Sequence, residues 1–386
     1  MKKLILYILI VCIPVLSGCG DVNIYSSHSE PEDLVVIKAI GIDYEDGAVK
    51  VTAAAGTAAD GKKPEIYTSA AKTLSEAING IQNGYLGNEA YFSHAEQVII
   101  GEEAAKNGIT EYLDYIGRNV YMRLSTDLYI VKDSTAQSLM EDTAGKDVSS
   151  SDILESIGKK SEYMASGRVF TCQDVMTGLG ESGNALVYVI EKGEPLQVGA
   201  EEETAGIRPV GYALIKDGYL EEYLDTGVTE GAGIVMGHTK SGMLTVDAEN
   251  HGTITLKIID MKTEYEPIYK NKDTASVTVK VKVKLNVEES AEGLNYINED
   301  FREKIESAAA EEIRQTAVLA IEKSQALGTD FCGIGDAVYI REPHKFRKTH
   351  EKWQDIFKDI QIGLEVETEL QRTYDMENSL NFTGDE

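Results

Sequence analysis

The stretch Thr274-Ala-Ser-Val-Thr-Val-Lys-Val-Lys-Val-Lys-Leu-Asn-Val287 alternates apolar and polar side chains along its whole length. Successive side chains of a strand point to opposite faces of a sheet, so the valines would share one face and the lysines the other. A strand of this kind has one buried face and one face toward solvent. The sequence therefore predicts a half-covered antiparallel sheet in the C-terminal part of the chain.

A second alternating run lies near the C-terminus. Apolar residues from Ile362 to Leu370 alternate with Glu365, Glu367 and Glu369. A lysine face on one strand and a glutamate face on the other favour cross-strand pairing. We expect the two strands to share a sheet with their charges on the same side. Two separately solvated strands are the alternative.

A long helix is predicted between these two strands. Asn298 is placed to cap its start and Gly328 to end it. Its alanines would allow close packing on the sheet, and at 1.5 Å per residue it would be about 43 Å long. A shorter helix from Glu351 to Phe357, which contains the only tryptophan, Trp353, would clamp the last strand. The apolar residues of the long helix recur at near-helical spacing: Phe301, Ile305, Ala309, Ile313, Ala317 and Ile321.

Strands and helices alternate in the N-terminal half. Leu34 to Ile37 is strand-like, and Asp46-Gly47 is typical of a hairpin turn before a β-type run. Further strands are predicted at 98–100, 128–131 and 186–190, and helical stretches at 69–81, 102–117, 136–140, 151–157 and 172–179. The predicted fold class is therefore α+β, with a mixed α/β N-terminal half and a C-terminal antiparallel sheet packed against a long helix.

The segment 192–209 is rich in Gly, Pro and Glu, and we expect it to form a linker or a long loop. We place the main domain boundary there. The N-terminal α/β region would then be 34–200, as one domain or more, and the C-terminal α+β domain 207–375. Residues 376–386 would be a flexible tail.

The first residues of the chain carry an export signal. A basic start precedes an apolar run from Leu4 to Leu16, which is too short to span about 30 Å of hydrocarbon. The run ends in Leu-Ser-Gly-Cys19, which resembles the bacterial lipobox, where the cysteine sulfur takes a diacylglyceryl group and the chain is cut before the cysteine. We predict a signal peptide at 1–18, lipidation of Cys19 and a tether at 19–33. A plain signal peptide with an accidental cysteine is the alternative.

The composition excludes some partners. The 386 residues carry a formal net charge of −28, and phosphate binding depends on clustered Lys and Arg, so nucleic acid is a poor partner. Anionic headgroups would repel such a surface and leave the body standing off the bilayer, so that only the lipid on Cys19 would hold the protein to a membrane. Beyond the signal, Cys172 and Cys332 remain, and free buried thiols are favoured over one disulfide.

One set of motifs is ordered like those of the penicillin-recognising enzymes: Ser156 with Lys159, Ser182 with Asn184, and Lys240 with Gly242. Only 26 residues separate Ser156 from Ser182, too few for the helical domain that such enzymes place there. No nucleophile, base and orienting group can be assembled elsewhere. We therefore assign no catalytic, cofactor-binding or metal-binding residue, and the residues alone indicate an extracytoplasmic binding or structural lipoprotein.

Three stretches carry a family resemblance. The first is the lipobox followed by Ala39-Ile-Gly-Ile-Asp43, and the second runs from Tyr91 to Glu103 and contains His94. The last follows the long helix and contains Asp330-Phe331, Gly333-Ile-Gly335, Trp353 and Phe357. In this order and spacing they resemble the Ger(x)C spore germination lipoproteins, the C subunits of nutrient germinant receptors.

The resemblance implies a place on the outer face of the spore's inner membrane, beside an A subunit and a transporter-like B subunit. The family has no known catalytic activity, and its germinant pocket is thought to lie on the B subunit. Cys19 alone therefore carries over as a functional residue. We expect a non-enzymatic receptor subunit needed for assembly or signal coupling. The alternative is a solute-binding lipoprotein of a transporter, which would need a deep cleft between two α/β lobes.

Overall fold

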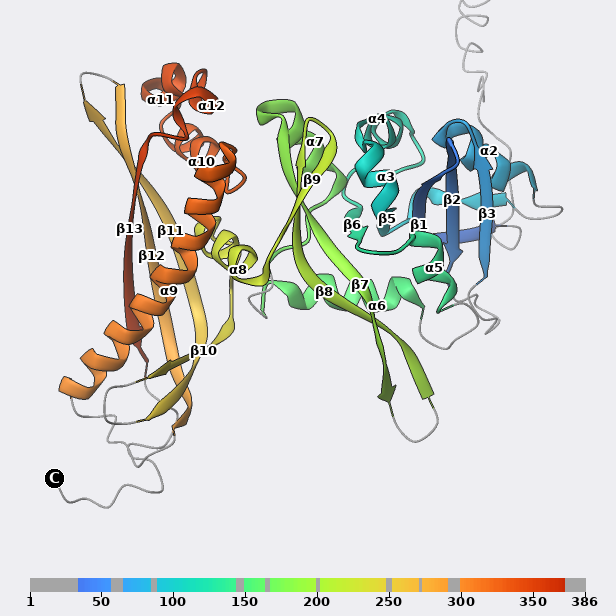
Figure 1. Cartoon of the computed structure of the whole chain (residues 1–386). Coiled ribbons are helices and arrows are strands. Elements are labelled where there is room, and N and C mark those ends of the chain that lie inside the picture. The colour runs from blue at the N-terminus through green and yellow to red at the C-terminus, as the bar shows by residue number, and fades with distance from the viewer. Residues whose placement is uncertain are drawn as a thin grey trace, which may run out of the picture.

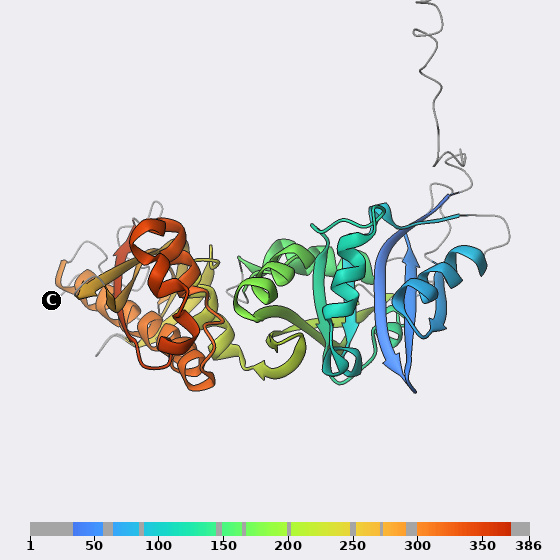
Figure 2. The same cartoon turned by 90° about the horizontal axis from the view of Figure 1, so that it is seen from above.

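The computed structural model describes residues 34–56, 65–84, 89–143, 149–163, 167–198, 202–247, 252–270, 273–290 and 299–371. They form two lobes, built on a nine-stranded sheet and a four-stranded sheet. The lobes lie side by side and give the molecule an elongated shape (Figures 1 and 2). The α+β class predicted from the sequence is confirmed.

Nine strands form the N-terminal sheet: β1 (Leu34–Glu45), β2 (Ala48–Ala55), β3 (Ile66–Ala71), β4 (Glu89–Tyr91), β5 (Gln97–Gly101), β6 (Asp127–Val131), β7 (Asn184–Val198), β8 (Glu202–Lys216) and β9 (Tyr219–Leu224). Their order is β3-β2-β1-β5-β6-β7-β8-β9, and β4 pairs with β1. Strands β1, β5, β6 and β7 are parallel, and antiparallel strands extend the sheet on both sides.

Helices cover both faces of this sheet: α2 (Leu74–Gly84), η2 (Phe92–His94), α3 (Glu102–Asn107), α4 (Thr110–Arg118), α5 (Ala136–Glu141), α6 (Ser150–Ser161) and α7 (Cys172–Ser182). Ile78 of α2 and Leu113 of α4 share a core with Ile100. Leu139 of α5 shares the opposite core with Ile99. Neighbouring residues of a strand face opposite sides of the sheet, so Ile99 and Ile100 of β5 belong to different cores. The predicted mixed α/β half is confirmed.

Two hairpin turns are built on Asp-Gly pairs, and the sequence predicted the first of them, at Asp46-Gly47. Asp46 and Gly47 have φ angles of 52° and 80°, and Asp217 and Gly218 have φ angles of 52° and 88°. Two central residues with positive φ are required by the turn that matches the twist of paired strands, and Asp-Gly adopts it readily. The hairpins β1–β2 and β8–β9 are therefore fixed by these local residues.

The interpretation of 192–209 as a linker or long loop is wrong. The segment pairs along the β7–β8 hairpin, with Lys192 opposite Ile207. Pro209 lies at a register shift, and a Cβ on Gly206 would collide with the carbonyl oxygen of Glu194. Here the proline lies at a bulge and the glycine allows a close approach of two backbones. Both residue types are also common in linkers, which is why the segment resembled one. The sheet continues through β9, while the division into independently folding domains stays a prediction.

The C-terminal sheet has the order β10 (Gly242–Asp247), β11 (Thr253–Lys270), β12 (Asp273–Ser290) and β13 (Gln361–Leu370). β12 is the alternating strand, with Val279 and Val281 fully buried and Lys282 exposed. β10, β11 and β12 are antiparallel as predicted, but β13 runs parallel to β12. A parallel neighbour needs a long crossover, and the helical segment between β12 and β13 supplies it.

The charged faces of β12 and β13 meet on one side of the sheet, as predicted. The register places Lys280, Lys282 and Lys284 opposite Glu365, Glu367 and Glu369, respectively. The Lys280 ammonium lies 3.4 Å from the Glu365 carboxylate, and the corresponding distance from Lys282 to Glu367 is 4.0 Å. Two separately solvated strands are therefore excluded.

The predicted long helix is α9 (Glu299–Leu327), which covers the apolar face of this sheet (Figure 1). Gly328, with a φ of 61°, ends it, whereas the proposed cap Asn298 lies outside the described residues. Three short helices follow: α10 (Ile334–Arg341), α11 (Pro343–His350) and α12 (Trp353–Ile356). α12 lies within the predicted 351–357 helix, while α10 and α11 were not predicted.

A helix with many small residues, α8 (Thr226–Val235), lies between the two sheets (Figure 1). A Cβ on Gly231 would collide with the carbonyl oxygen of Thr316 in α9, so the two helices touch along their backbones. Val235 of α8 belongs to one buried cluster together with Tyr212 of β8 and Ile313 of α9. The apolar core therefore runs through α8 from one lobe into the other.

Candidate functional site

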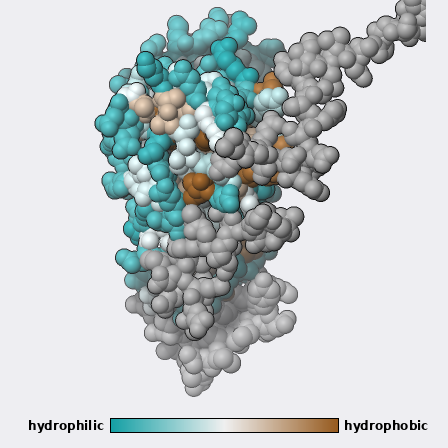
Figure 3. Space-filling model, turned by 90° about the vertical axis from the view of Figure 1, so that its right-hand side faces the viewer, coloured by the Kyte–Doolittle hydropathy of each residue, from teal (hydrophilic) through white to brown (hydrophobic). Residues whose placement is uncertain are grey.

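The only functional residue expected from the sequence, Cys19, lies outside the described residues, as does the segment 20–33 that follows it. Its lipidation therefore stays a prediction. No helix in the ranges that the structure describes is long and apolar enough to cross a bilayer. The end of the N-terminal lobe, shown in Figure 3, is mainly hydrophilic and carries small separate apolar spots.

A buried carboxylate stands at the carboxyl end of β1. Asp43 is 3 % exposed, and its oxygens accept hydrogen bonds from the backbone N–H of Ala136 at 2.8 Å and of Gln137 at 2.9 Å. A Cβ on Gly101 would collide with Oδ1 of Asp43, so only glycine fits at the end of β5. Burial raises the pKa of Asp43, while the two N–H donors oppose that change. Asp43 thus anchors the start of α5 to β1.

An acidic hollow of about 640 Å³ opens next to Asp43. It lies at the carboxyl ends of the parallel strands β1, β5 and β6, the edge at which open α/β sheets usually bind ligands. Glu102 and Glu103 of this edge hold Lys106 at 2.7 and 2.9 Å. The described residues include no group of three His, Cys, Asp or Glu placed to hold a metal ion. The hollow is lined by the carboxylates of Asp43, Glu45, Glu102, Glu103, Asp133 and Glu141 and by Lys50 and Lys106.

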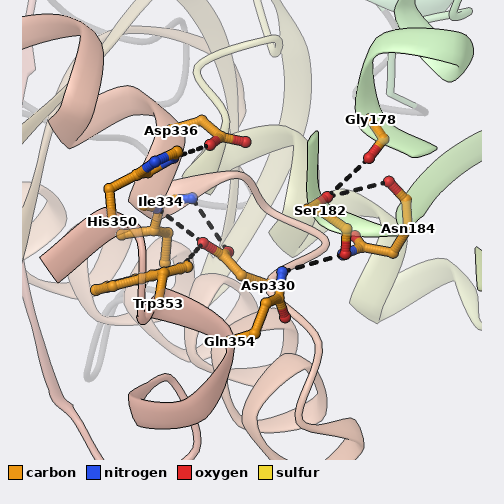
Figure 4. A network of polar contacts seen from close by, with 10 residues as sticks. Gly178, Ser182, Asn184, Asp330, Ile334, Asp336, His350, Trp353 and Gln354 are labelled. Atoms are coloured by element: carbon orange, nitrogen blue, oxygen red, sulfur yellow. Dashed lines mark hydrogen bonds and ion pairs between the residues drawn. The ribbon is translucent and has the colours of Figure 1, made fainter. Parts of the chain in front are cut away.

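A second buried carboxylate organises the C-terminal lobe. Asp330 accepts hydrogen bonds from the backbone N–H of Ile334 at 3.1 Å and of Gly335 at 2.8 Å, and from Nε1 of Trp353 at 2.7 Å (Figure 4). Burial raises its pKa to about 6 against the opposing effect of these three donors. A Cβ on Gly335 would collide with the indole of Trp353. Asp330 therefore holds the start of α10 against the start of α12.

The aromatic residues of this region pack around the same point. Trp353 lies 5.4 Å from Phe346 and 5.7 Å from Phe357 between ring centroids. His350 bonds to Asp336 at 2.7 Å and stacks on Tyr339 at 4.3 Å. The motif residues that carried the family resemblance in this region therefore form one structural cluster. Tryptophan and aspartate, 23 positions apart, meet only because α10 and α11 fold back between them.

His94, in the second of the motif stretches, is exposed and not part of the core. Its ring is tilted against that of Tyr91, with the centroids 5.6 Å apart. The stretch as a whole forms η2, β5 and the first turn of α3, so its buried residues place the central strand of the sheet. In the described structure this stretch therefore helps to build the sheet, while His94 lies on its surface.

The residues of the rejected penicillin-type set have local partners. Lys159 pairs with Glu155, and Lys240 pairs with Glu162. The hydroxyl of Ser182 donates to the carbonyl oxygen of Gly178 at 2.9 Å (Figure 4). These contacts cap or brace helices and do not form a nucleophile with a base.

Polar contacts also join the two lobes. Gln354 donates through Nε2 to the carbonyl oxygen of Ser182 at 3.2 Å (Figure 4), and Lys323 lies 2.6 Å from Glu222. Together with α8, these contacts fix the end of α7 and the edge strand β9 against the C-terminal lobe. Cys172 and Cys332 are both free and buried, one in each lobe.

Two family models match the chain and together span both lobes. Residues 27–192 match the spore germination protein N-terminal domain, and residues 210–374 match the spore germination B3/GerAC-like C-terminal domain. The chain belongs to the GerAC family of spore germination proteins. The family resemblance drawn from the sequence is therefore confirmed.

Relatives of this family align along almost the whole chain. Spore germination protein KC of Bacillus subtilis is 23% identical, with 96% of each chain covered, and YfkR of the same organism is 22% identical, with 92% of each covered. The crystal structure of the GerBC protein superposes with a TM-score of 0.57 at 16% identity, over 86% of this chain and 97% of that one. This likeness shows the fold that the germination protein shares with GerBC.

Proposed function

We propose that this germination protein is the lipid-anchored, non-enzymatic C subunit of a spore nutrient germinant receptor. The observation that carries the proposal is the match of both lobes to the two germination family models, at 27–192 and 210–374. A lipid on Cys19 would attach it to the outer face of the membrane. There it would contribute to assembly or signal coupling beside the receptor's A and B subunits.

The internal chemistry supports a structural role. The carboxylates of Asp43 and Asp330 both accept hydrogen bonds from the backbone of a following helix. Each carboxylate therefore holds the start of a helix in place, which is a structural use of a buried acid. The protein would therefore act through its surfaces and its position at the membrane.

The proposal is tested by germination of spores that carry Cys19→Ala. We expect slower germination with one class of nutrient and loss of the protein from the membrane fraction. Cys12→Ala, which changes a cysteine within the apolar run of the signal, is the matched control and should leave both readouts unchanged. Immunoblots of whole spores separate loss of anchoring from loss of the protein.

Normal germination with the protein absent from the membrane fraction would contradict the proposal and favour the solute-binding alternative. That alternative requires a ligand cleft between two lobes. The acidic hollow beside Asp43 and a second hollow beside Tyr269 each lie within a single lobe. Neither hollow therefore favours a solute-binding protein.

A further inference from the structure

A basic face interrupts the acidic surface of the molecule on the C-terminal lobe. Residues 341–352 contain five Lys and Arg against two Glu, a local net charge of +3 in a chain with a net charge of −28. All five basic side chains are exposed, on α11 and the residues that flank it. We call this set the α11 basic face: Arg341, Lys345, Arg347, Lys348 and Lys352.

The positive charge of this face exceeds what its neighbours neutralise. Lys345 lies 3.3 Å from Glu342, and Arg347 lies 3.9 Å from Glu351. Glu342 also accepts a hydrogen bond from the hydroxyl of Tyr269 at 2.8 Å. Within the described ranges, Lys348 and Lys352 form no ion pair. The face therefore presents uncompensated cations to solvent.

The shape and composition around these cations fit a lipid headgroup region. A hollow of about 630 Å³ is lined by Tyr269, His344, Lys345, Arg347 and Lys348, and the Lys345 ammonium lies 5.8 Å from the centre of the Tyr269 ring. At the end of α10, directly before the basic residues, Ile340 is 80 % exposed. Cations beside an exposed aliphatic side chain are what an anionic bilayer surface attracts, since phosphates meet the charges and the interface accepts the apolar group.

We propose that the α11 basic face docks on anionic phospholipid headgroups and holds the C-terminal lobe against the membrane. The inference rests on the proposed lipid at Cys19, which would keep the bilayer at high effective concentration. The chain enters the fold through β1 in the N-terminal lobe, whereas α11 lies in the other lobe (Figure 1). Lipid and basic face would therefore attach the two lobes separately.

This proposal revises the expectation that a strongly acidic body stands off the bilayer. At physiological ionic strength, charges more than about 8 Å apart are largely screened from one another. The acidic residues elsewhere on the molecule therefore do not cancel the attraction at α11. The orientation of the molecule is decided by the local charge of the face that meets the membrane.

The test measures flotation of the mature chain, from residue 19 onward with Cys19→Ser, on vesicles of phosphatidylcholine mixed with phosphatidylglycerol. We expect salt-sensitive binding to these vesicles and none to phosphatidylcholine alone. The variant with Lys345→Gln, Arg347→Gln and Lys348→Gln should bind at least about tenfold more weakly, since each cation near an anionic surface contributes about fivefold. Ile340→Ser should weaken binding without changing its salt dependence.

The matched control removes three exposed lysines from the strands of the same lobe. Lys257→Gln, Lys262→Gln and Lys282→Gln remove the same number of positive charges and should leave binding unchanged, because these residues lie outside the α11 basic face. Circular dichroism melts of both triple variants check that they fold.

Equal weakening by the two triple variants, or no binding of the unsubstituted chain to the anionic vesicles, would overturn the proposal. If the vesicles do not bind and the α11 variant also loses proteins that co-purify from spores, the face belongs to an acidic protein partner. Because the assay uses protein without lipid and does not measure germination, its failure leaves the proposed receptor function separately testable.

Discussion

Two buried aspartates do the same structural work in different lobes. Asp43 accepts hydrogen bonds from the first N–H groups of α5, and Asp330 accepts them from the first N–H groups of α10 and from the indole N–H of Trp353. In each case a glycine, Gly101 or Gly335, leaves the space that the carboxylate or its partner fills. A buried carboxylate is stable only when hydrogen bonds replace its lost hydration.

Asp330→Asn is therefore expected to destabilise the protein by about 2–4 kcal/mol, because the new amide N–H₂ group would face N–H donors. Chemical denaturation followed by circular dichroism measures this loss. Asp359→Asn, which changes an exposed carboxylate of the same lobe, is the control and should stay within about 0.5 kcal/mol of the unsubstituted protein. A cost for Asp330→Asn as small as that of the control would show that the network is not stabilising.

His238 is expected to make the stability of the protein depend on pH. His238 lies in the segment that joins α8 to β10, its ring is 5.7 Å from the ring of Phe170, and its Nδ1 has no hydrogen-bond partner among the residues that the structure describes. Burial lowers the pKa of His238 from 6.5 to about 4, and Arg168 adds to that effect. Below pH 6.5 the His238 ring takes up a proton in the unfolded chain but stays neutral in the folded protein. The free energy of unfolding is therefore highest above pH 6.5 and falls as the pH drops toward 4.

His238→Gln should remove this contribution to the pH dependence of stability. Between pH 7.5 and pH 4.5, the unfolding free energy of the unsubstituted protein should fall by up to about 3 kcal/mol more than that of the variant. Urea denaturation at the two pH values measures the difference. Parallel losses in both proteins would mean that His238 takes up its proton without resistance in the folded state.

At the scale of elements, the packing of α8 on α9 depends on one position. Gly231→Ala would drive its methyl group into the carbonyl oxygen of Thr316 and should cost about 1–3 kcal/mol, as overpacked contacts do. The new methyl group of Gly180→Ala in α7 meets no atom of the described residues within 4 Å, so this change should be neutral or stabilise by up to about 1 kcal/mol through better helix propensity. Thermal unfolding of the two variants compares them. A neutral Gly231→Ala would mean that the helices separate without cost.

The elements that sequence reasoning found are those fixed by local residues. The alternation around Val281 predicted β12, and the Asp46-Gly47 pair predicted a hairpin turn, because period and turn chemistry reside in a few adjacent positions. The direction of β13 was not predicted, since an alternating strand has the same pattern in either direction. The β7–β8 hairpin was missed because a bulge at Pro209 uses the residue types of a loop.

The candidate sites were predictable only in part. The carboxylate of Asp43 meets N–H groups 93 and 94 positions away, and Asp330 meets an indole 23 positions away. No local spacing encodes such contacts, because they depend on where the sheet places the ends of its strands. Cys19 is the opposite case, since its lipobox is read as a short linear motif.

At the scale of the whole molecule, the two lobes are expected to unfold together. The buried cluster runs from Tyr212 through Val235 to Ile313 without interruption. Trp353, the only tryptophan, reports on the C-terminal lobe alone, whereas far-ultraviolet circular dichroism reports on both. Denaturation curves from the two signals should coincide. Gly231→Val, which wedges α8 from α9, should separate them, and separate curves in the unsubstituted protein would show that the lobes are independent.

The glycine contact between α8 and α9 also sets how the molecule would respond to a push. Hinged proteins absorb displacement in a loose connection, but here the connection is a helix embedded in apolar packing on both sides. A small tilt imposed on one lobe would therefore turn the other by the same angle, and length would convert that angle into a larger translation at the far end. The fold has the mechanics of a lever.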